Sequence, residues 1–255
     1  MSKAELKLLN PPIVEAVLDI ECDLPPGQQL TTLEAAARDC FRDHYPKYRL
    51  QMFDEHQIES RPGESVNVSM RQGVIALQFL QDDEKQLVQL RVQGFSFNRL
   101  SPYSSLDDYL PEIERSWRLY VQLASPVQIR LIRLRYINRM LIPMVDGRVE
   151  LDAYFRVAPR LPDEERLVLA GFLHQNAAVE VKTGNQAQIV LTSQNPEGES
   201  LPVIFDNSVT STEIGEPENW GWIASRIQTL RELKNHIFSR SLTDQCLNLF
   251  QQLKA

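Results

Sequence analysis

The segment from Val127 to Ile142 reads VQIRLIRLRYINRMLI, and it decides the fold of this chain. Apolar and polar residues alternate along it, as they do in a β-strand with one buried and one exposed face. The alternation changes phase at Leu131-Ile132, which predicts a β-bulge there. Pro126 precedes the segment and favours a strand start. The length and apolar content predict a central strand of one continuous sheet.

The chain before this strand is predicted to form a strand, a helix, a meander and a second helix. The first strand is expected at Ile13–Cys22 and the first helix from about Leu30 to His44, before Pro46. Antiparallel strands are expected over Tyr48–Glu59, Val66–Met70, Gly73–Leu80 and Leu87–Phe97. The second helix, from about Ser105 to Leu123, has an apolar stripe that includes Leu110, Ile113, Trp117 and Val121.

The chain after the central strand repeats this plan more loosely. A short helical turn is expected at Glu150–Phe155, and a long helix, broken or continuous, over Trp220–Phe250. Strands are expected between them at Glu165–Leu173, Ala178–Lys182, Gln188–Thr192 and Leu201–Thr210.

This element order predicts an α+β fold in which a curved antiparallel sheet grips long helices. We expect one domain spanning 1–255, with two pseudo-repeats at about 10–125 and 126–255, each ordered β-α-β(3-4)-α. The motif Phe97-Asn98-Arg99-Leu100 is similar to Ile137-Asn138-Arg139-Met140, a weak sign of duplication. The order resembles the TATA-binding-protein-like and START-like folds, an analogy that carries no function.

Composition limits the cellular setting and the classes of partner. The net charge of −7 opposes non-specific nucleic-acid binding, which requires neutralisation of phosphates. Three scattered cysteines, Cys22, Cys40 and Cys246, favour a reducing compartment. No apolar run is long enough to span a bilayer, and the N-terminus lacks the pattern of a secretory signal. We therefore predict a cytoplasmic protein with no membrane partner.

The usual catalytic and cofactor motifs are absent from the sequence. It contains no GxxxxGK[ST], GxGxxG, HExxH or GxSxG pattern. The four histidines are isolated from one another and from the cysteines, so no metal site is predicted. No cofactor and no catalytic residue are predicted, although an enzyme without a local motif stays open as an alternative.

Arginines gather in the middle of the chain. The stretch 91–160 holds eleven arginines and no lysines against seven acids, so it carries +4 within an acidic protein. Guanidinium groups bind carboxylates and phosphates in a bidentate fashion. The same arginines could instead pair with acids of this chain, and the sequence leaves both readings open. The candidate binding residues are Asn98, Arg99, Tyr103, Arg133, Arg135, Asn138 and Arg139.

Four strings of this sequence resemble those of a sporadically distributed bacterial family of uncharacterised proteins of about this length. The strings are NPPIVEAVLDI at 10–20, FSFNRLSPY at 95–103, LRYINRMLIP at 134–143 and LKNHIFSRSLTD at 233–244. The resemblance spans nearly the whole chain in the same order. It implies no activity, cofactor or catalytic residue, and the patchy distribution suits accessory roles such as defence or toxin–antitoxin systems.

Three functional hypotheses follow from the sequence. The first is a non-enzymatic interaction or regulatory protein that binds an acidic protein partner or an anion through the arginine-rich surface. The second is a small-molecule-binding domain with a pocket between the sheet and a long helix. The third is an enzyme without a local motif. Homo-oligomerisation is compatible with all three.

Overall fold

The computed structural model describes residues 8–59, 67–163, 166–167 and 169–251. Within these residues, nine strands form one antiparallel sheet in the order β2-β3-β4-β5-β1-β6-β9-β8-β7. The strands are β1 Ile13–Asp23, β2 Lys47–Glu59, β3 Asn67–Leu80, β4 Gln86–Arg91, β5 Gly94–Leu100, β6 Gln128–Pro143, β7 Leu173–Val179, β8 Gln186–Ser193 and β9 Ser200–Ser211. The helices are α1 Leu30–Phe41, α2 Leu106–Ala124, α3 Leu151–Tyr154, α4 Trp220–Ser241 and α5 Asp244–Asn248. The predicted α+β class with an antiparallel sheet is confirmed.

The centre of the sheet is the pair formed by β1 and β6. Leu18 lies opposite Leu134 in this pair. β5 borders β1 on its other side, and β9 borders β6 on its other side. The first part of the chain therefore runs β-α-β-β-β-β-α on one side of the centre, and the second part runs β-α-β-β-β-α on the other.

The central strand contains the bulge that its sequence predicts. Leu131 lies opposite Glu21, but the next partner along the ladder, Cys22, lies opposite Ile129. Arg130 is the extra residue, one position before the predicted phase change. The bulge returns both Ile129 and Ile132 to the buried face, although they are three residues apart.

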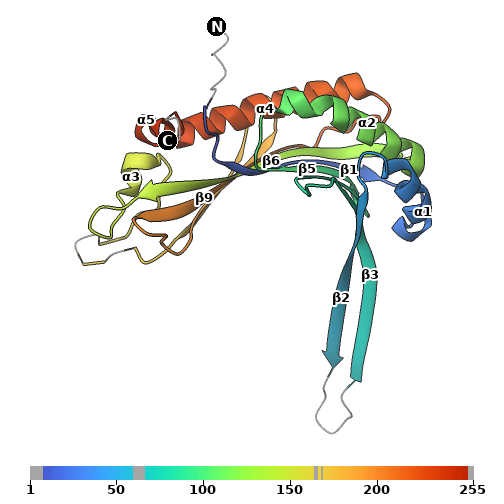
Figure 1. The fold of residues 1–255 in the computed structure, drawn as a ribbon, viewed down its shortest axis with the longest axis horizontal. Coiled ribbons are helices and arrows are strands. Elements are labelled where there is room, and N and C mark those ends of the chain that lie inside the picture. The colour runs from blue at the N-terminus through green and yellow to red at the C-terminus, as the bar shows by residue number, and fades with distance from the viewer. Residues whose placement is uncertain (1–7, 60–66, 164–165, 168, 252–255) are drawn as a thin grey trace.

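The helices cover one face of the sheet and leave the other uncovered. Figure 1 shows α2 and α4 lying over the same face, while the β2–β3 hairpin projects away from them on the opposite side. α1 packs near β3 and α2, at the end of the sheet that carries this hairpin.

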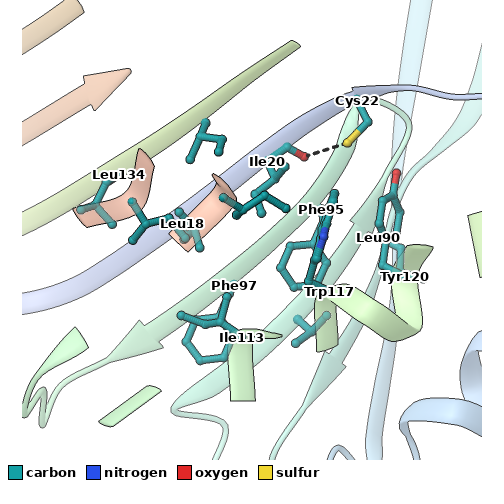
Figure 2. Packing of buried hydrophobic residues seen from close by; sticks show 14 of the residues in the cluster. Leu18, Ile20, Cys22, Leu90, Phe95, Phe97, Ile113, Trp117, Tyr120 and Leu134 are labelled. Carbon is teal, nitrogen blue, oxygen red and sulfur yellow. Dashed lines mark hydrogen bonds between the residues drawn. The ribbon is translucent and has the colours of Figure 1, made fainter. Parts of the chain in front are cut away.

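Two hydrophobic clusters fill the space between the helices and the sheet. The larger lies under α2 and the first part of α4, and Figure 2 shows Phe95, Trp117 and Tyr120 packed together within it. The smaller contains Met140 and Phe205, and lies towards α3, α5 and the end of α4. Burial of this apolar surface is the main force that attaches the helices to the sheet.

The buried face of α2 follows the predicted stripe, with differences in depth along it. Ile113, Trp117 and Tyr120 are fully buried, whereas Leu110 and Val121 are only half-buried. Tyr120 contacts the Trp117 ring with centroids 5.3 Å apart. Aromatic side chains bury more surface than aliphatic ones, so the helix turns its aromatic pair inward.

The strand expected over Glu165–Leu173 is wrong except for its final residue. Residues 166–167 and 169–172 lie in no strand, and Glu165 is outside the described residues. Leu167 and Leu169 are 48% and 36% exposed, whereas Phe172 packs against the smaller hydrophobic cluster. The strand expected at Ala178–Lys182 is β7, which begins earlier and stops at Val179, because the chain then turns back towards β8 with the Gly184 N–H bonded to Glu180 O at 2.9 Å.

Other boundaries differ for local reasons. The strands expected at Val66–Met70 and Gly73–Leu80 form one strand, β3, with Val66 outside the described residues. The strand expected over Leu87–Phe97 is two strands, β4 and β5, joined by a turn at Val92-Gln93. The first helix ends at Phe41 rather than His44. The last helical region breaks at Leu242, which bridges to Phe155.

No helix in the described part of the chain is both long enough and apolar enough to cross a membrane.

A half-buried carboxylate ties α2, β4 and the segment that follows α1 together at one end of the sheet. Glu112 on α2 accepts hydrogen bonds from the Tyr45 hydroxyl at 2.8 Å and from Ser116 Oγ at 3.0 Å. Arg115 donates to both of its oxygens, at 2.8 and 2.7 Å. Gln86 on β4 completes the cluster by donating to Tyr45 at 3.0 Å. Burial opposes ionisation of Glu112, but these hydrogen bonds outweigh it and lower the pKa of the carboxyl.

We expect Glu112→Gln to destabilise the protein by about 1–2 kcal/mol at pH 7, because Arg115 loses its charged partner. Since folding lowers the pKa of Glu112, the carboxylate stabilises the fold fully above the unfolded pKa of about 4.3. That stability is lost as the pH falls from there through the folded pKa. The difference between wild type and variant in urea titrations should therefore shrink in acid. Glu114→Gln, at a more accessible position of the same helix, is the control, and a pH-independent difference for Glu112→Gln would contradict this role.

Candidate functional site

The helix-facing side of β6 carries polar residues where the hydrophobic pattern predicts apolar ones. Leu134 belongs to the larger cluster and Met140 to the smaller, while Tyr136 and Asn138 lie between them. Asn138 is 1% exposed and Asn207, on the neighbouring strand β9, is fully buried. Buried polar groups must find hydrogen-bond partners, so sequences rarely retain them at core positions without a specific role.

A pocket of about 370 Å³ lies at this polar break. Its floor is β6, one wall is α4, and the opposite wall is the loop that leads from β5 into α2. The segment before β1 closes a further side with Leu8, Pro11 and Pro12. Apolar walls with a few converging polar groups are typical of sites for small molecules.

Two tyrosines meet at the pocket. The hydroxyls of Tyr103 and Tyr136 lie 2.6 Å apart, and their rings pack edge to face at 5.4 Å. One of the two hydroxyls donates its single proton to the other. The accepting hydroxyl keeps its own proton, which it can donate to a third group. Burial, with smaller effects from Tyr136, raises the pKa of Tyr103 far above its usual value. Tyr103 therefore acts as a neutral hydrogen-bonding group.

Two cations of α4 line the same pocket, one helical turn apart. Lys234 is only 9% exposed, and its Nζ lies 3.7 Å from the centre of the Tyr136 ring. Arg231 donates to Asp107 Oδ1 at 2.7 Å. This hydrogen bond, strengthened by the charge of Arg231, lowers the pKa of Asp107. The described lining residues of the pocket thus include two cations and one carboxylate.

Two asparagines of the sheet hold the pocket in place. Asn138 Nδ2 donates to the Phe205 carbonyl at 3.0 Å and so joins β6 to β9 through its side chain. Asn207 Nδ2 donates to the Lys234 carbonyl at 2.9 Å and ties α4 to the sheet. The Asn207 bond fixes the height of α4 above the floor and the Asn138 bond braces the floor itself, so the pocket is preformed by its own polar framework.

The start of α2 forms part of the opposite wall. Ser105 caps the helix by accepting a hydrogen bond from the Asp107 N–H, and Ser104, Ser105 and Leu106 all line the pocket. The amino end of a 19-residue helix carries partial positive charge. It therefore adds to the charge of the two α4 cations.

The residues predicted from the sequence divide between the two faces of the sheet. Tyr103 and Asn138 line the pocket on the helix side. Arg99 is also on that side but outside the pocket, with its guanidinium 5.4 Å from the Tyr109 ring centre and a bond to Pro102 O at 3.4 Å. The remaining four, Asn98, Arg133, Arg135 and Arg139, lie on the uncovered side.

The β6 residues Arg133, Arg135 and Arg139 share the uncovered face, and each meets a carboxylate of this chain. Arg133 lies 3.4 Å from Glu21, and Arg139 lies 2.5 Å from Glu197. Arg135 forms a fork with Asp206, with Nε 2.9 Å from Oδ1 and Nη2 2.5 Å from Oδ2. The hydrogen bonds to Asp206 raise the pKa of Arg135. Intramolecular pairing, one of the two readings left open by the sequence, is what these contacts show.

Asn98 belongs to a chain of side-chain amides that crosses the uncovered face. Gln89 donates to Asn98 Oδ1 at 2.9 Å, and Asn98 donates to Glu15 at 2.8 Å. Gln78 donates to Gln89 at 2.9 Å and extends the chain to β3. The Asn98 side chain therefore links neighbouring strands of the sheet through hydrogen bonds.

Sequence reasoning missed Tyr136, Arg231 and Lys234. A signal for Lys234 exists, because the apolar stripe of α4 passes through Leu230 and Phe238, and Lys234 lies four residues from each. A lysine at that position must be buried with the stripe. A corresponding signal exists for Tyr136 and Asn138 in the strand. Both residues carry polar atoms at positions of β6 where the alternation places buried apolar residues.

Among the described residues, no three His, Cys, Asp or Glu side chains gather as ligands of a metal ion would. Comparisons with known proteins add no assignment to the pocket, since no protein-family model, curated protein or solved structure matches this chain.

Proposed function

We propose that this chain is a non-enzymatic binding protein for a small anionic molecule, which it holds in the pocket between β6 and α4. The observation that carries the proposal is the burial of Lys234 beside Arg231 in a preformed pocket of an acidic protein. Lysine is almost never this buried unless a negative or polar group compensates for its lost hydration. An anion in the pocket would provide further compensation.

The chemistry of the lining supports an anion with an apolar body. Lys234 and the start of α2 approach the pocket from opposite walls and would bind the charged group. Tyr103 and Tyr136 offer hydroxyls, while Phe238 and Pro12 offer apolar contact. A volume of about 370 Å³ is near the lower end of the range for ligand sites, which suits a small carboxylate or phosphate monoester.

The pairing on the uncovered face supports placing the anion here. Arg133, Arg135 and Arg139 are already matched by carboxylates, so an anion there would have to displace Glu21, Asp206 or Glu197. Binding rather than catalysis is supported by the state of Asp107. This carboxylate is held by Arg231, which makes it a weak proton acceptor.

For the finer fold we infer the TATA-binding-protein-like arrangement. Support comes from the order β-α-β(4)-α in the first part of the chain and β-α-β(3)-α in the second, with the first strands of the two parts paired at the centre. The similar strings at 97–100 and 137–140 do not contribute, because they lie on β5 and β6, which hold different places in that order. The fold carries no function of its own.

The test is a thermal-shift screen of small carboxylates and phosphate monoesters, followed by calorimetric titration of any hit. Lys234→Met removes the charge and keeps the volume, and it should weaken binding by about 10- to 150-fold, the value of one charged hydrogen bond. Arg240→Met makes the same charge change at an exposed position of α4 and should bind like the wild type. Anion binding that survives Lys234→Met would rule out the pocket as the site.

A further inference from the structure

The outer strand β7 ends the sheet without any of the usual protection of a strand edge. It is the last strand in the sheet order, and no other described strand borders its far side. Six of its seven residues are exposed, so no helix covers it on either face. Leu173 and Val179 are 69% and 63% exposed. An uncovered edge of this kind readily pairs with another strand.

The opposite edge of the sheet offers a contrast. There β2 carries Lys47 and Arg49, both of which pair with Glu84. Charges on an edge strand discourage pairing with other chains. β7 reads LHQNAAV, with no lysine, acid or proline, and its ladder with β8 has no register shift. This chain therefore protects the described part of one edge and leaves the other open.

The backbone groups that point outward from β7 can be identified from its neighbours. The Phe172 carbonyl accepts from Ser193, and the Glu180 N–H donates to Asn185, so the even-numbered residues face β8. N–H and C=O groups alternate sides along a strand. The odd-numbered residues Leu173, Gln175 and Ala177, together with Val179, therefore direct their backbone groups to the open edge.

We propose that two copies of this chain dimerise by antiparallel pairing of their β7 strands, with the twofold axis at Asn176, to form one continuous sheet. In this register Leu173 faces Val179 of the second copy, and Gln175 faces its Ala177. Every outward-facing residue of β7 then meets another outward-facing residue. The apolar ends are matched, and no like charges meet within the paired strands.

The composition of β7 favours a second copy over a charged partner. The strand has no charged residue with which to select an acidic or basic peptide, whereas its two large exposed apolar residues, Leu173 and Val179, stand symmetrically about Asn176. A twofold interface requires a patch that complements itself. The dimer is independent of the ligand pocket, because β7 contributes no residue to that pocket.

The first test is the mass of the full chain in solution, by light scattering coupled to size-exclusion chromatography. The wild type should have twice the chain mass of 29.3 kDa. The double variant Gln175→Lys/Ala177→Lys places lysines directly opposite lysines and should raise the dimer dissociation constant at least tenfold. The matched control, Gln186→Lys/Gln188→Lys, adds the same charge to the same face one strand inward and should remain dimeric. A monomeric wild type, or a lysine edge variant that stays dimeric, would overturn the proposal.

The second test fixes the register. In a Cys40→Ser background, which removes the exposed native thiol, Asn176→Cys should form a disulfide-linked dimer on mild oxidation. Directly opposite residues in a non-hydrogen-bonded antiparallel pair have Cα atoms about 4.5 Å apart, within the range that a disulfide accepts. His174→Cys should not cross-link, because it faces Ala178 of the second copy. Cross-linking at 174 but not at 176 would exclude this register.

Discussion

Replacing Trp117 with alanine should destabilise the protein by about 3–5 kcal/mol, because the indole is 1% exposed and its removal leaves a cavity in the larger core. The ring contacts Phe95 and Tyr120, with centroids 5.7 and 5.3 Å away. Its Nε1 also donates to the Pro217 carbonyl at 2.9 Å, and the loss of this donor leaves a buried acceptor unsatisfied. The indole thus connects α2 to the segment before α4 as well as to the sheet.

Denaturant titration followed by far-UV circular dichroism measures this effect without depending on tryptophan fluorescence. Trp117→Phe keeps an aromatic ring but loses the hydrogen bond, so its cost should be smaller than that of alanine. Arg118→Ala lies on the exposed side of the same helix and should change the stability by at most about 0.5 kcal/mol. A cost for Trp117→Ala as small as that of Arg118→Ala would mean that α2 does not pack on the sheet through this residue.

Replacing Gly94 with alanine should cost a comparable amount for a different reason. Gly94 has φ +139°, a conformation that side-chain-bearing residues rarely adopt, and a Cβ there would lie 2.2 Å from the Ile20 carbonyl oxygen. The obstacle is backbone of β1, which cannot move without separating β1 from β5. Backbone strain of about 1–3 kcal/mol adds to an overpacking cost of similar size, so we expect a loss of about 2–6 kcal/mol.

Gly198→Ala is the control for this substitution. Gly198 also has a positive φ, +60°, but its missing Cβ would meet nothing within 4 Å. That variant bears only the conformational cost, about 1–2 kcal/mol. Equal melting temperatures for the two variants would show that the β1–β5 contact is not tight at Gly94.

The parts of the fold that follow from local patterns were predictable. The alternation in Val127–Ile142 gave β6, its central place and its bulge to within one residue, since side-chain period and burial are linked along a strand. The capped, periodic segment after Ser105 gave α2 in the same way. The error at Glu165–Leu173 has the opposite cause. An apolar run forms a strand only where a neighbouring strand supplies backbone partners, and its described residues before Phe172 lie in no strand and pair with none.

The sequence by itself determined the α+β class, the strand–helix order and the positions at which apolar periodicity fails. It did not determine which distant segments meet, because contacts between residues such as Tyr103 and Tyr136 depend on how the helices settle on the sheet. Arg133, Arg135 and Arg139 share a face by strand period alone, but their carboxylate partners lie on other strands and loops. Only the tertiary structure neutralised those arginines and enclosed Lys234, since burial and charge pairing are properties of the assembled fold rather than of local sequence.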